Sequence, residues 1–180
     1  FNNPLGACPE CQGLGVQRRF SHDLCIDERA TIDDGCVYPF RRSMMSGWYK
    51  SLMRQTFTHY GFDIHTPVQD LDEDALDVLL WGSGSTAIQY EFSSKKGSSY
   101  RMNRPWEGVF ARLERTFTET SSERTRNRLL SYMTDEPCLA CNGAKLNPAV
   151  RGVIVGGTNL PSFNGASILD ALAIIQIWST

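Results

Sequence analysis

The sequence contains 180 residues, of which 41% are hydrophobic and 21% are charged, and its formal net charge is −2. This composition is that of an ordinary globular protein and excludes a collagen-like, low-complexity or strongly basic chain. The apolar stretches are too short and interrupted to span a bilayer, and the opening residues lack the basic and apolar regions of a signal peptide. We therefore expect a cytoplasmic protein with no membrane partner.

The first third of the chain combines a turn-rich start with one clear helix. Residues 1–20 are rich in Gly, Pro and Asn and surround two cysteines. Residues 23–38 are typical of a loop with short extended pieces. Apolar side chains at helical spacing predict an amphipathic helix over residues 48–60, and Gly61 is a suitable stop.

The middle of the chain predicts a helix followed by a hairpin. Residues 70–81 form the expected helix, because Asp70 or Asp72 can cap its start and acidic side chains fill its first turn. Residues 87–92 alternate between apolar and polar side chains, as a strand does. A polar turn then leads to the expected return strand over residues 100–103.

The last third predicts two more helices, a short strand and a final helix. Residues 107–118 place their apolar side chains on one helical side. The sequence from Thr120 to Glu123 has the spacing of a capping box and predicts a helix that continues to about Met133. Residues 153–157 read as a short strand entering a turn, and the final helix starts near Ser167.

Two segments of the chain share the pattern C-x-x-C-x-G. They are Cys8–Gly13 and Cys138–Gly143. Two residues between cysteines allow both sulfurs to meet one metal ion, and the following glycine can adopt positive φ. Zn²⁺ takes four ligands in a tetrahedron, so two such knuckles fill a structural site and leave no open position. The predicted ligands are Cys8, Cys11, Cys138 and Cys141.

The wide separation of the two knuckles predicts an insertion. One metal can join them only if the intervening chain leaves the site and returns to it. Closing a long loop costs entropy that grows only logarithmically with length, and zinc binding at roughly 10 kcal/mol or more can offset that cost. We expect an α+β chain with a zinc-knuckle base, formed by residues 1–35 and 121–180, and a small inserted α+β domain over residues 36–120.

Two other uses of the cysteines stay open at this point. Disulfide bonds are one alternative, although the expected cytoplasmic setting is reducing. A thioredoxin-like redox motif is another, but such a motif follows a strand and opens a helix, whereas Gly and Pro surround these cysteines. Cys25 and Cys36 are left over, and a second metal site would need a ligand such as His22.

Several stretches resemble the UvrA family, the ATP-dependent damage sensors of bacterial nucleotide excision repair. The opening knuckle is the most specific, and the remaining stretches follow in the family's order. The resemblance covers nearly the whole chain and rests on residues 1–15, 80–84, 106–109, 112–120, 138–148, 153–157 and the helix from Ser167.

The resemblance implies that the knuckles belong to the signature domain of an ABC-type ATPase and that the insertion contacts DNA. It also implies damaged double-stranded DNA, UvrB and a second UvrA copy as partners. The chain itself has no G-x-x-x-x-G-K-[ST] motif, since residues 82–86 lack the required Lys. ATP and Mg²⁺ are therefore expected only in a longer parent protein, of which we expect this chain to be a piece. Lys145 stands where the family usually has Arg. This difference keeps the positive charge but loses the paired hydrogen bonds that a guanidinium can donate to one anion.

A cluster of cations offers candidate contacts to DNA phosphates, which carry affinity without sequence information. The candidates lie on the hairpin, on the helix after it and beside the second knuckle; they are Lys95, Lys96, Arg101, Arg104, Arg112, Arg115 and Lys145. A solvated charged surface is the plain alternative for such a run. No catalytic arrangement of side chains is evident in the sequence.

Two competing functions are compatible with the same motifs. Residues 8–15 fit C-x-x-C-x-G-x-G, the repeat of DnaJ-type chaperone modules, although that family uses four closely spaced repeats. A UvrA-like paralogue in antibiotic self-resistance would share the domain plan of a repair protein.

Overall fold

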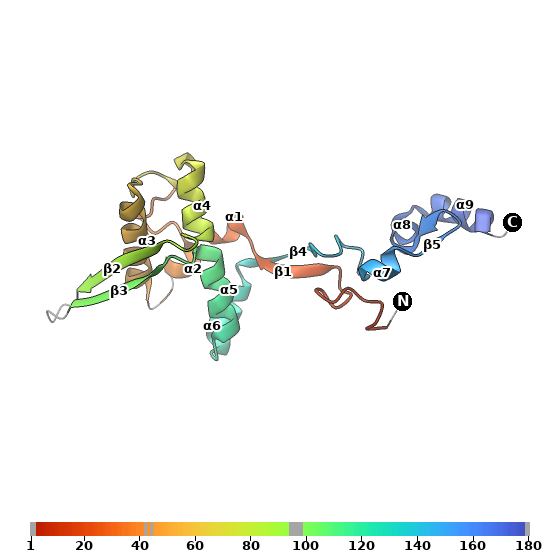
Figure 1. Ribbon diagram of the computed structural model, residues 1–180, viewed down its shortest axis with the longest axis horizontal. Helices are drawn as coiled ribbons and strands as arrows, with labels where there is room; N and C mark the ends of the chain where they lie inside the picture. Colours follow the sequence, from red (N-terminus) through yellow and green to blue (C-terminus); the bar gives the residue numbers. More distant parts are fainter. Residues whose placement is uncertain (1–2, 42, 44, 94–98, 179–180) are drawn as a thin grey trace. The chain divides into compact units, whose positions relative to one another are not determined.

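The computed structural model describes residues 3–41, 43, 45–93 and 99–178. The chain divides into two compact units. Residues 1–19 and 134–180 form the first unit, and residues 20–133 form the second. Helices and short two-stranded sheets alternate along the chain (Figure 1), so the expected mixture of helix and strand is confirmed.

The second unit contains the main hydrophobic core. It begins with two short helices, α1 (His22–Cys25) and α2 (Tyr38–Arg41), which precede the long helix α3 (Ser46–Tyr60). The inward face of α3 buries Tyr49, Leu52, Met53, Thr56 and Phe57. Gly61 ends α3 in the left-handed conformation, with φ at 77°, which glycine adopts at little cost. The helix predicted over residues 48–60 is therefore confirmed.

The helix predicted over residues 70–81 begins later than expected. A 3-10 turn, η1 (Val68–Asp70), comes first, and helix α4 (Glu73–Trp81) follows. Asp72 caps α4, because its carboxylate accepts a hydrogen bond of 2.7 Å from the amide of Ala75. The sequence left Asp70 and Asp72 as alternatives, and the structure selects Asp72.

The predicted hairpin is formed by β2 (Ala87–Ser93) and β3 (Ser99–Pro105), which pair antiparallel. Ile88 and Tyr90 point into the core, where the Tyr90 hydroxyl lies 3.0 Å from the hydroxyl of Thr56. Gln55 of α3 completes the edge of β2: its side chain accepts from the amide of Glu91 at 2.7 Å and donates to the carbonyl of Glu91 at 3.0 Å. The hairpin is thus fixed to α3 by both apolar packing and hydrogen bonds.

Two helices complete the second unit. They are α5 (Val109–Glu119) and α6 (Glu123–Leu130). Ser122 caps α6 by accepting a hydrogen bond from the amide of Thr125. The prediction that this helix continues to about Met133 is wrong, because the chain turns after Leu130 and enters strand β4 (Met133–Pro137).

The first unit contains the cysteine knuckles and a short ribbon. Strand β1 (Val16–Phe20) pairs with β4, and the limits of the two units fall within these strands. The sequence did not predict β1, since residues 1–20 read as turns. The remaining elements are α7 (Pro148–Arg151), β5 (Ile154–Val155), β6 (Thr158–Asn159), α8 (Leu160–Gly165) and α9 (Ile168–Trp178).

Helix α9 and the β5–β6 hairpin carry an unusual number of exposed apolar side chains. They are Val153, Ile154, Val155, Ile168, Leu169, Leu172, Ile175, Ile177 and Trp178. Among the described residues, no helix has both the length and the hydrophobicity that crossing a membrane requires.

The limits of the compact units differ from the expected domain limits. The expected insertion covered residues 36–120, whereas the compact unit covers residues 20–133. The difference arises because Phe20, Ile26 and Ile32 belong to the same core as α3, and Leu129 of α6 joins it from the other end of the segment. The assignment of an inserted domain to a separate function stays a prediction.

Candidate metal centre

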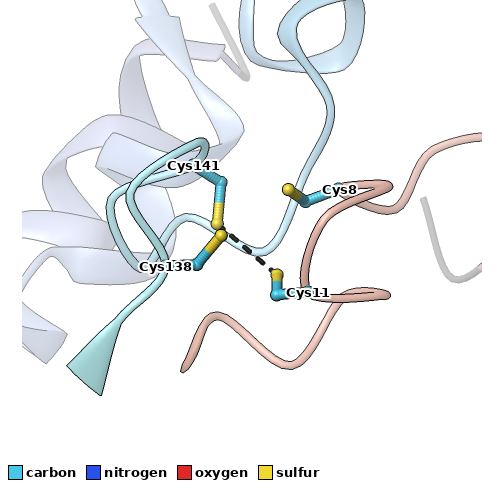
Figure 2. A group of neighbouring side chains, drawn as sticks. All are labelled: Cys8, Cys11, Cys138 and Cys141. Carbon is cyan, nitrogen blue, oxygen red and sulfur yellow. Dashed lines mark hydrogen bonds between the residues drawn. The ribbon is translucent and has the colours of Figure 1, made fainter. Parts of the chain in front are cut away.

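The four predicted cysteine ligands come together in the first unit (Figure 2). Their sulfur atoms all lie within 4.8 Å of one another, and the sulfurs of Cys11 and Cys141 are 3.7 Å apart. A regular tetrahedron with metal–sulfur bonds of about 2.3 Å places its sulfurs about 3.8 Å apart. All four side chains are buried, with exposed fractions from 0% to 4%. The donor set and its spacing therefore fit one metal ion with four sulfur ligands.

The two knuckles fold in the same way around their cysteines. In each, the residue after the second cysteine and the glycine after that both have positive φ: 52° and 82° for Gln12 and Gly13, 49° and 80° for Asn142 and Gly143. This tight turn brings the amide of Leu14 to the carbonyl of Cys11 at 2.9 Å. The amide of Ala144 reaches the carbonyl of Cys141 at the same distance. The repeated sequence pattern thus corresponds to a repeated backbone.

Lys145 occupies the position that glycine holds in the first knuckle. Gly15 has φ of 80°, and its amide donates a hydrogen bond of 3.2 Å to the sulfur of Cys11. Lys145 has φ of 67°, and its backbone makes the equivalent hydrogen bond to Cys141. Lys145 therefore adopts the left-handed backbone conformation, which costs about 1–2 kcal/mol for a residue other than glycine. The backbone at Lys145 therefore follows that of Gly15 although the second knuckle has no glycine at this position.

The knuckles also exchange a matched pair of backbone hydrogen bonds. The amide of Cys8 donates to the carbonyl of Lys145 at 2.9 Å, and the amide of Cys138 donates to the carbonyl of Gly15 at 2.9 Å. Each knuckle thus uses the amide of its first cysteine to hold the carbonyl that follows the other knuckle. This reciprocal arrangement holds the two knuckles beside each other.

The environments of Cys11 and Cys141 shift the pKa values of their thiols in opposite directions. Burial disfavours the thiolate of Cys11, but hydrogen bonds from the Gly15 amide and from neighbouring cysteines lower its pKa to about 7. Burial raises the pKa of Cys141 to about 11, with a partial offset from the Lys145 backbone. Cys11 therefore ionises before Cys141, and a cation that stabilises thiolates would relieve the burial cost for the whole group.

The two remaining cysteines do not form a second centre. Cys25 and Cys36 are both fully buried, and burial raises the pKa of each thiol to about 12. Among the described residues, the four knuckle cysteines form the only group of three or more neighbouring side chains that could bind a metal ion. Cys25 and Cys36 are therefore part of the apolar core.

Most of the described cations predicted to contact DNA are held by carboxylates. Arg101 pairs with Glu91 across the hairpin at 2.8 Å. Arg115 pairs with Glu107 at 2.8 Å and with Glu119 at 3.2 Å. Their contribution to DNA binding stays a prediction.

Arg112 and Arg104 lie beside the same aromatic ring. Arg112 pairs with Glu107, and its side chain is only 14% exposed. The guanidinium carbons of Arg104 and Arg112 lie 5.5 Å and 5.4 Å from the ring centre of Trp48, within the range of cation–π attraction. Lys95 and Lys96 lie outside the described residues, and Lys145 belongs to the knuckle unit rather than to the cluster around Glu107.

The sequence reasoning overlooked a second group of cations, on α3. Lys50 and Arg54 both pair with Asp33, at 3.3 Å and 3.2 Å. Their separation of four residues on a predicted helix was the available signal, because residues at that spacing lie on one face. The position of Asp33 opposite them was not visible in the sequence.

Comparisons with known proteins identify the family. A family model described as the UvrA DNA-binding domain matches residues 22–131. The chain is 35% identical over 177 residues to the UvrABC system protein A of Vibrio cholerae, covering 98% of this chain and 19% of that protein. It is also 35% identical over 179 residues to the UvrABC system protein A of Streptococcus mutans, covering 97% of this chain and 19% of that protein.

A solved structure shows the same fold. The crystal structure of UvrA2 from Deinococcus radiodurans matches with a TM-score of 0.61 at 24% sequence identity, covering 90% of this chain and 21% of that chain. The chain thus spans about a fifth of the length of the relatives it matches. The family model and the curated relatives agree with the knuckle pattern and the order of the motifs, and the chain belongs to the UvrA family.

Proposed function

We propose that this chain is the zinc-stabilised DNA-binding part of a UvrA-like protein that recognises damaged DNA in nucleotide excision repair. The proposal rests on the agreement between the residue range of the family match and the residue range of the second compact unit. The match to the UvrA DNA-binding domain covers residues 22–131, and the compact unit covers residues 20–133. The matched sequence therefore corresponds to one folded body with its own core.

Zinc is the metal we propose for the centre. Four buried thiolates in a closed set suit Zn²⁺, which prefers tetrahedral sulfur coordination and needs no open position in a structural role. The ligands would be Cys8, Cys11, Cys138 and Cys141, and the ion would join the two ends of the segment that contains the second unit. Because no position is left for water or substrate, the role of the ion is structural.

We also propose that the exposed apolar surface of α9 and β5–β6 packs against other parts of a full-length protein. Large apolar side chains exposed together on neighbouring elements commonly mark an interface. The binding and hydrolysis of ATP with Mg²⁺, and the contacts with UvrB and a second UvrA copy, are assigned to that longer protein. Neither competing function is favoured: the chaperone modules have closely spaced repeats, and the relatives are named as UvrABC proteins.

A binding assay tests the proposed function. The purified chain should bind a fluorescent duplex without regard to sequence, and its affinity should fall steeply as salt rises. A lesion in the duplex should increase the affinity if the chain contributes to recognition of damage by reading DNA deformability. Absence of duplex binding at low salt would refute the proposal. Suppression of the aggregation of an unfolded client would instead support the chaperone function.

Metal analysis tests the centre separately. Protein purified without added metal should contain about one zinc per chain, and Cys138→Ser should remove it. Cys25→Ser is the matched control, because Cys25 lies in the apolar core and should leave the metal content unchanged.

A further inference from the structure

The outward face of α3 carries two cations that share one counter-ion. Lys50 and Arg54 lie one helical turn apart, and the same carboxylate oxygen of Asp33 is 3.3 Å from the ammonium and 3.2 Å from the guanidinium. The side chains are 39%, 48% and 33% exposed for Lys50, Arg54 and Asp33. Two positive charges therefore face one negative charge at an accessible site.

This charge balance differs from that of the other ion pairs in the unit. Arg101 has Glu91 to itself, whereas Arg112 and Arg115 share two carboxylates, those of Glu107 and Glu119. Those groups are locally neutral. Lys50 and Arg54 are two cations that share the single carboxylate of Asp33. The next acidic group is Asp34, whose pKa is lowered first by hydrogen bonds from Thr31 and then by the charges of Lys50 and Arg41. An anion from outside can compete with Asp33 for the two cations.

The same face of α3 is hollowed into a shallow groove. The groove has a volume of about 390 Å³ and is lined by Gly47, Lys50, Ser51, Arg54, Gln55 and Thr58. Ser51 accepts a hydrogen bond from Gln55 at 3.0 Å, and its hydroxyl hydrogen can donate to a ligand. Gly47 adds no side chain to the groove, and a Cβ placed there would meet nothing within 4 Å. The lining thus offers an ammonium, a guanidinium and a hydroxyl, all of them donors to an oxyanion.

We propose that this groove binds a phosphate of the DNA backbone through Lys50 and Arg54, with Asp33 as the internal counter-ion that the phosphate replaces. The proposal rests on the proposed function and identifies α3 as a face that contacts DNA. A carboxylate that already pairs with both cations weakens DNA binding, because the phosphate must compete with it. Loss of the Asp33 charge and loss of the α3 cations therefore have opposite effects on affinity.

The experiment measures the affinity of the whole chain for an undamaged fluorescent duplex between about 50 mM and about 200 mM salt. Asp33→Asn should raise the affinity at the lower salt by roughly threefold to tenfold and steepen the slope of log affinity against log salt by about 0.9, equivalent to one more phosphate neutralised. The double variant Lys50→Gln, Arg54→Gln should lower the affinity and flatten the slope by about 1 to 2. Asp74→Asn is the matched control: it makes the same charge change on the exposed face of α4, and it should alter the affinity by less than about twofold.

The outcomes separate the inference from the proposed function. If the chain binds duplex DNA but the double variant binds as the unchanged chain does, the DNA contacts lie elsewhere and the inference is wrong. Equal effects of Asp33→Asn and Asp74→Asn would also overturn it, because they would indicate a general effect of net charge. No duplex binding by the unchanged chain would remove the proposed function and the inference together. Circular dichroism checks the fold of each variant, and the double variant keeps the test valid if Asp33→Asn does not fold.

Discussion

Replacing Gly15 by alanine should destabilise the metal centre far more than the same replacement at Gly143. Both residues have φ of 80°, so alanine meets the same backbone cost at both positions. That cost is about 1–2 kcal/mol, and the reduced freedom of the unfolded chain offsets up to about 1 kcal/mol of it. We expect Gly143→Ala to destabilise by about 0.5–1 kcal/mol, since a Cβ there meets nothing within 4 Å.

Gly15 has the additional cost of a collision. A Cβ at this position would lie 2.8 Å from Cγ of Lys145 and 3.0 Å from the carbonyl oxygen of Gly143. The Lys145 side chain can shift, but the carbonyl belongs to the second knuckle and cannot move without disturbing the turn. Overpacking of this kind costs about 1–3 kcal/mol, so the total for Gly15→Ala is about 2–4 kcal/mol.

Urea unfolding at fixed protein and zinc concentrations measures both variants, and competition with a chelator measures their zinc affinity. Lys145→Gly in the Gly15→Ala background should recover part of the lost stability, because it removes the nearest colliding atom. If Gly15→Ala and Gly143→Ala lose equal stability, close packing between the knuckles is not what requires glycine at residue 15, and the reasoning is refuted.

Three further predictions follow from buried groups. The pKa of Cys11 is lowered to about 7, so its thiolate is lost as pH falls through that value, and chelator competition should show weaker zinc binding at about pH 6 than at about pH 8. Thr56→Val should cost about 1–3 kcal/mol in urea unfolding, because it leaves the buried Tyr90 hydroxyl without its partner at 3.0 Å; a loss below the error of the measurement would contradict this. Cys25 and Cys36, with pKa values raised to about 12, should resist a thiol reagent until urea unfolds the chain, and rapid labelling of the native protein would show that their burial is wrong.

The sequence predicted those features whose signal lies within a short window. The helix over residues 48–60 was predictable because its apolar residues recur at helical spacing, and the structure places α3 at Ser46–Tyr60. The hairpin was predictable from strand alternation around a polar turn. The cysteine cluster was also predictable, because two short motifs with the same cysteine spacing together supply the four ligands of one metal ion.

The ribbon of β1 and β4 was not predictable in the same way. Val16–Phe20 contains two arginines and follows several glycines, and its strand character depends on a partner at the far end of the chain. Met133–Pro137 follows a helix, and nothing in its own composition ends that helix early. Pairing between distant segments is a tertiary effect that local propensity does not encode.

The candidate DNA contacts likewise depend on tertiary structure that the sequence alone does not reveal. Positive charge near the hairpin was evident in the sequence, but the carboxylates that neutralise Arg101 and Arg115 depend on strand register and helix packing. The shared use of Asp33 by Lys50 and Arg54 joins a loop to a helix. Only the folded chain reveals which carboxylate each cation contacts.

The reciprocal hydrogen bonds between the knuckles have a consequence for synthesis. Cys138 and Cys141 leave the ribosome only after the whole of the second unit. The hydrogen bond from the amide of Cys8 to the carbonyl of Lys145 therefore cannot form until that unit has been made. Throughout the synthesis of residues 20–133, the thiols of the first knuckle therefore lack their partners from the second knuckle. A metal ion held by all four sulfurs could therefore bind only after the second knuckle has been made.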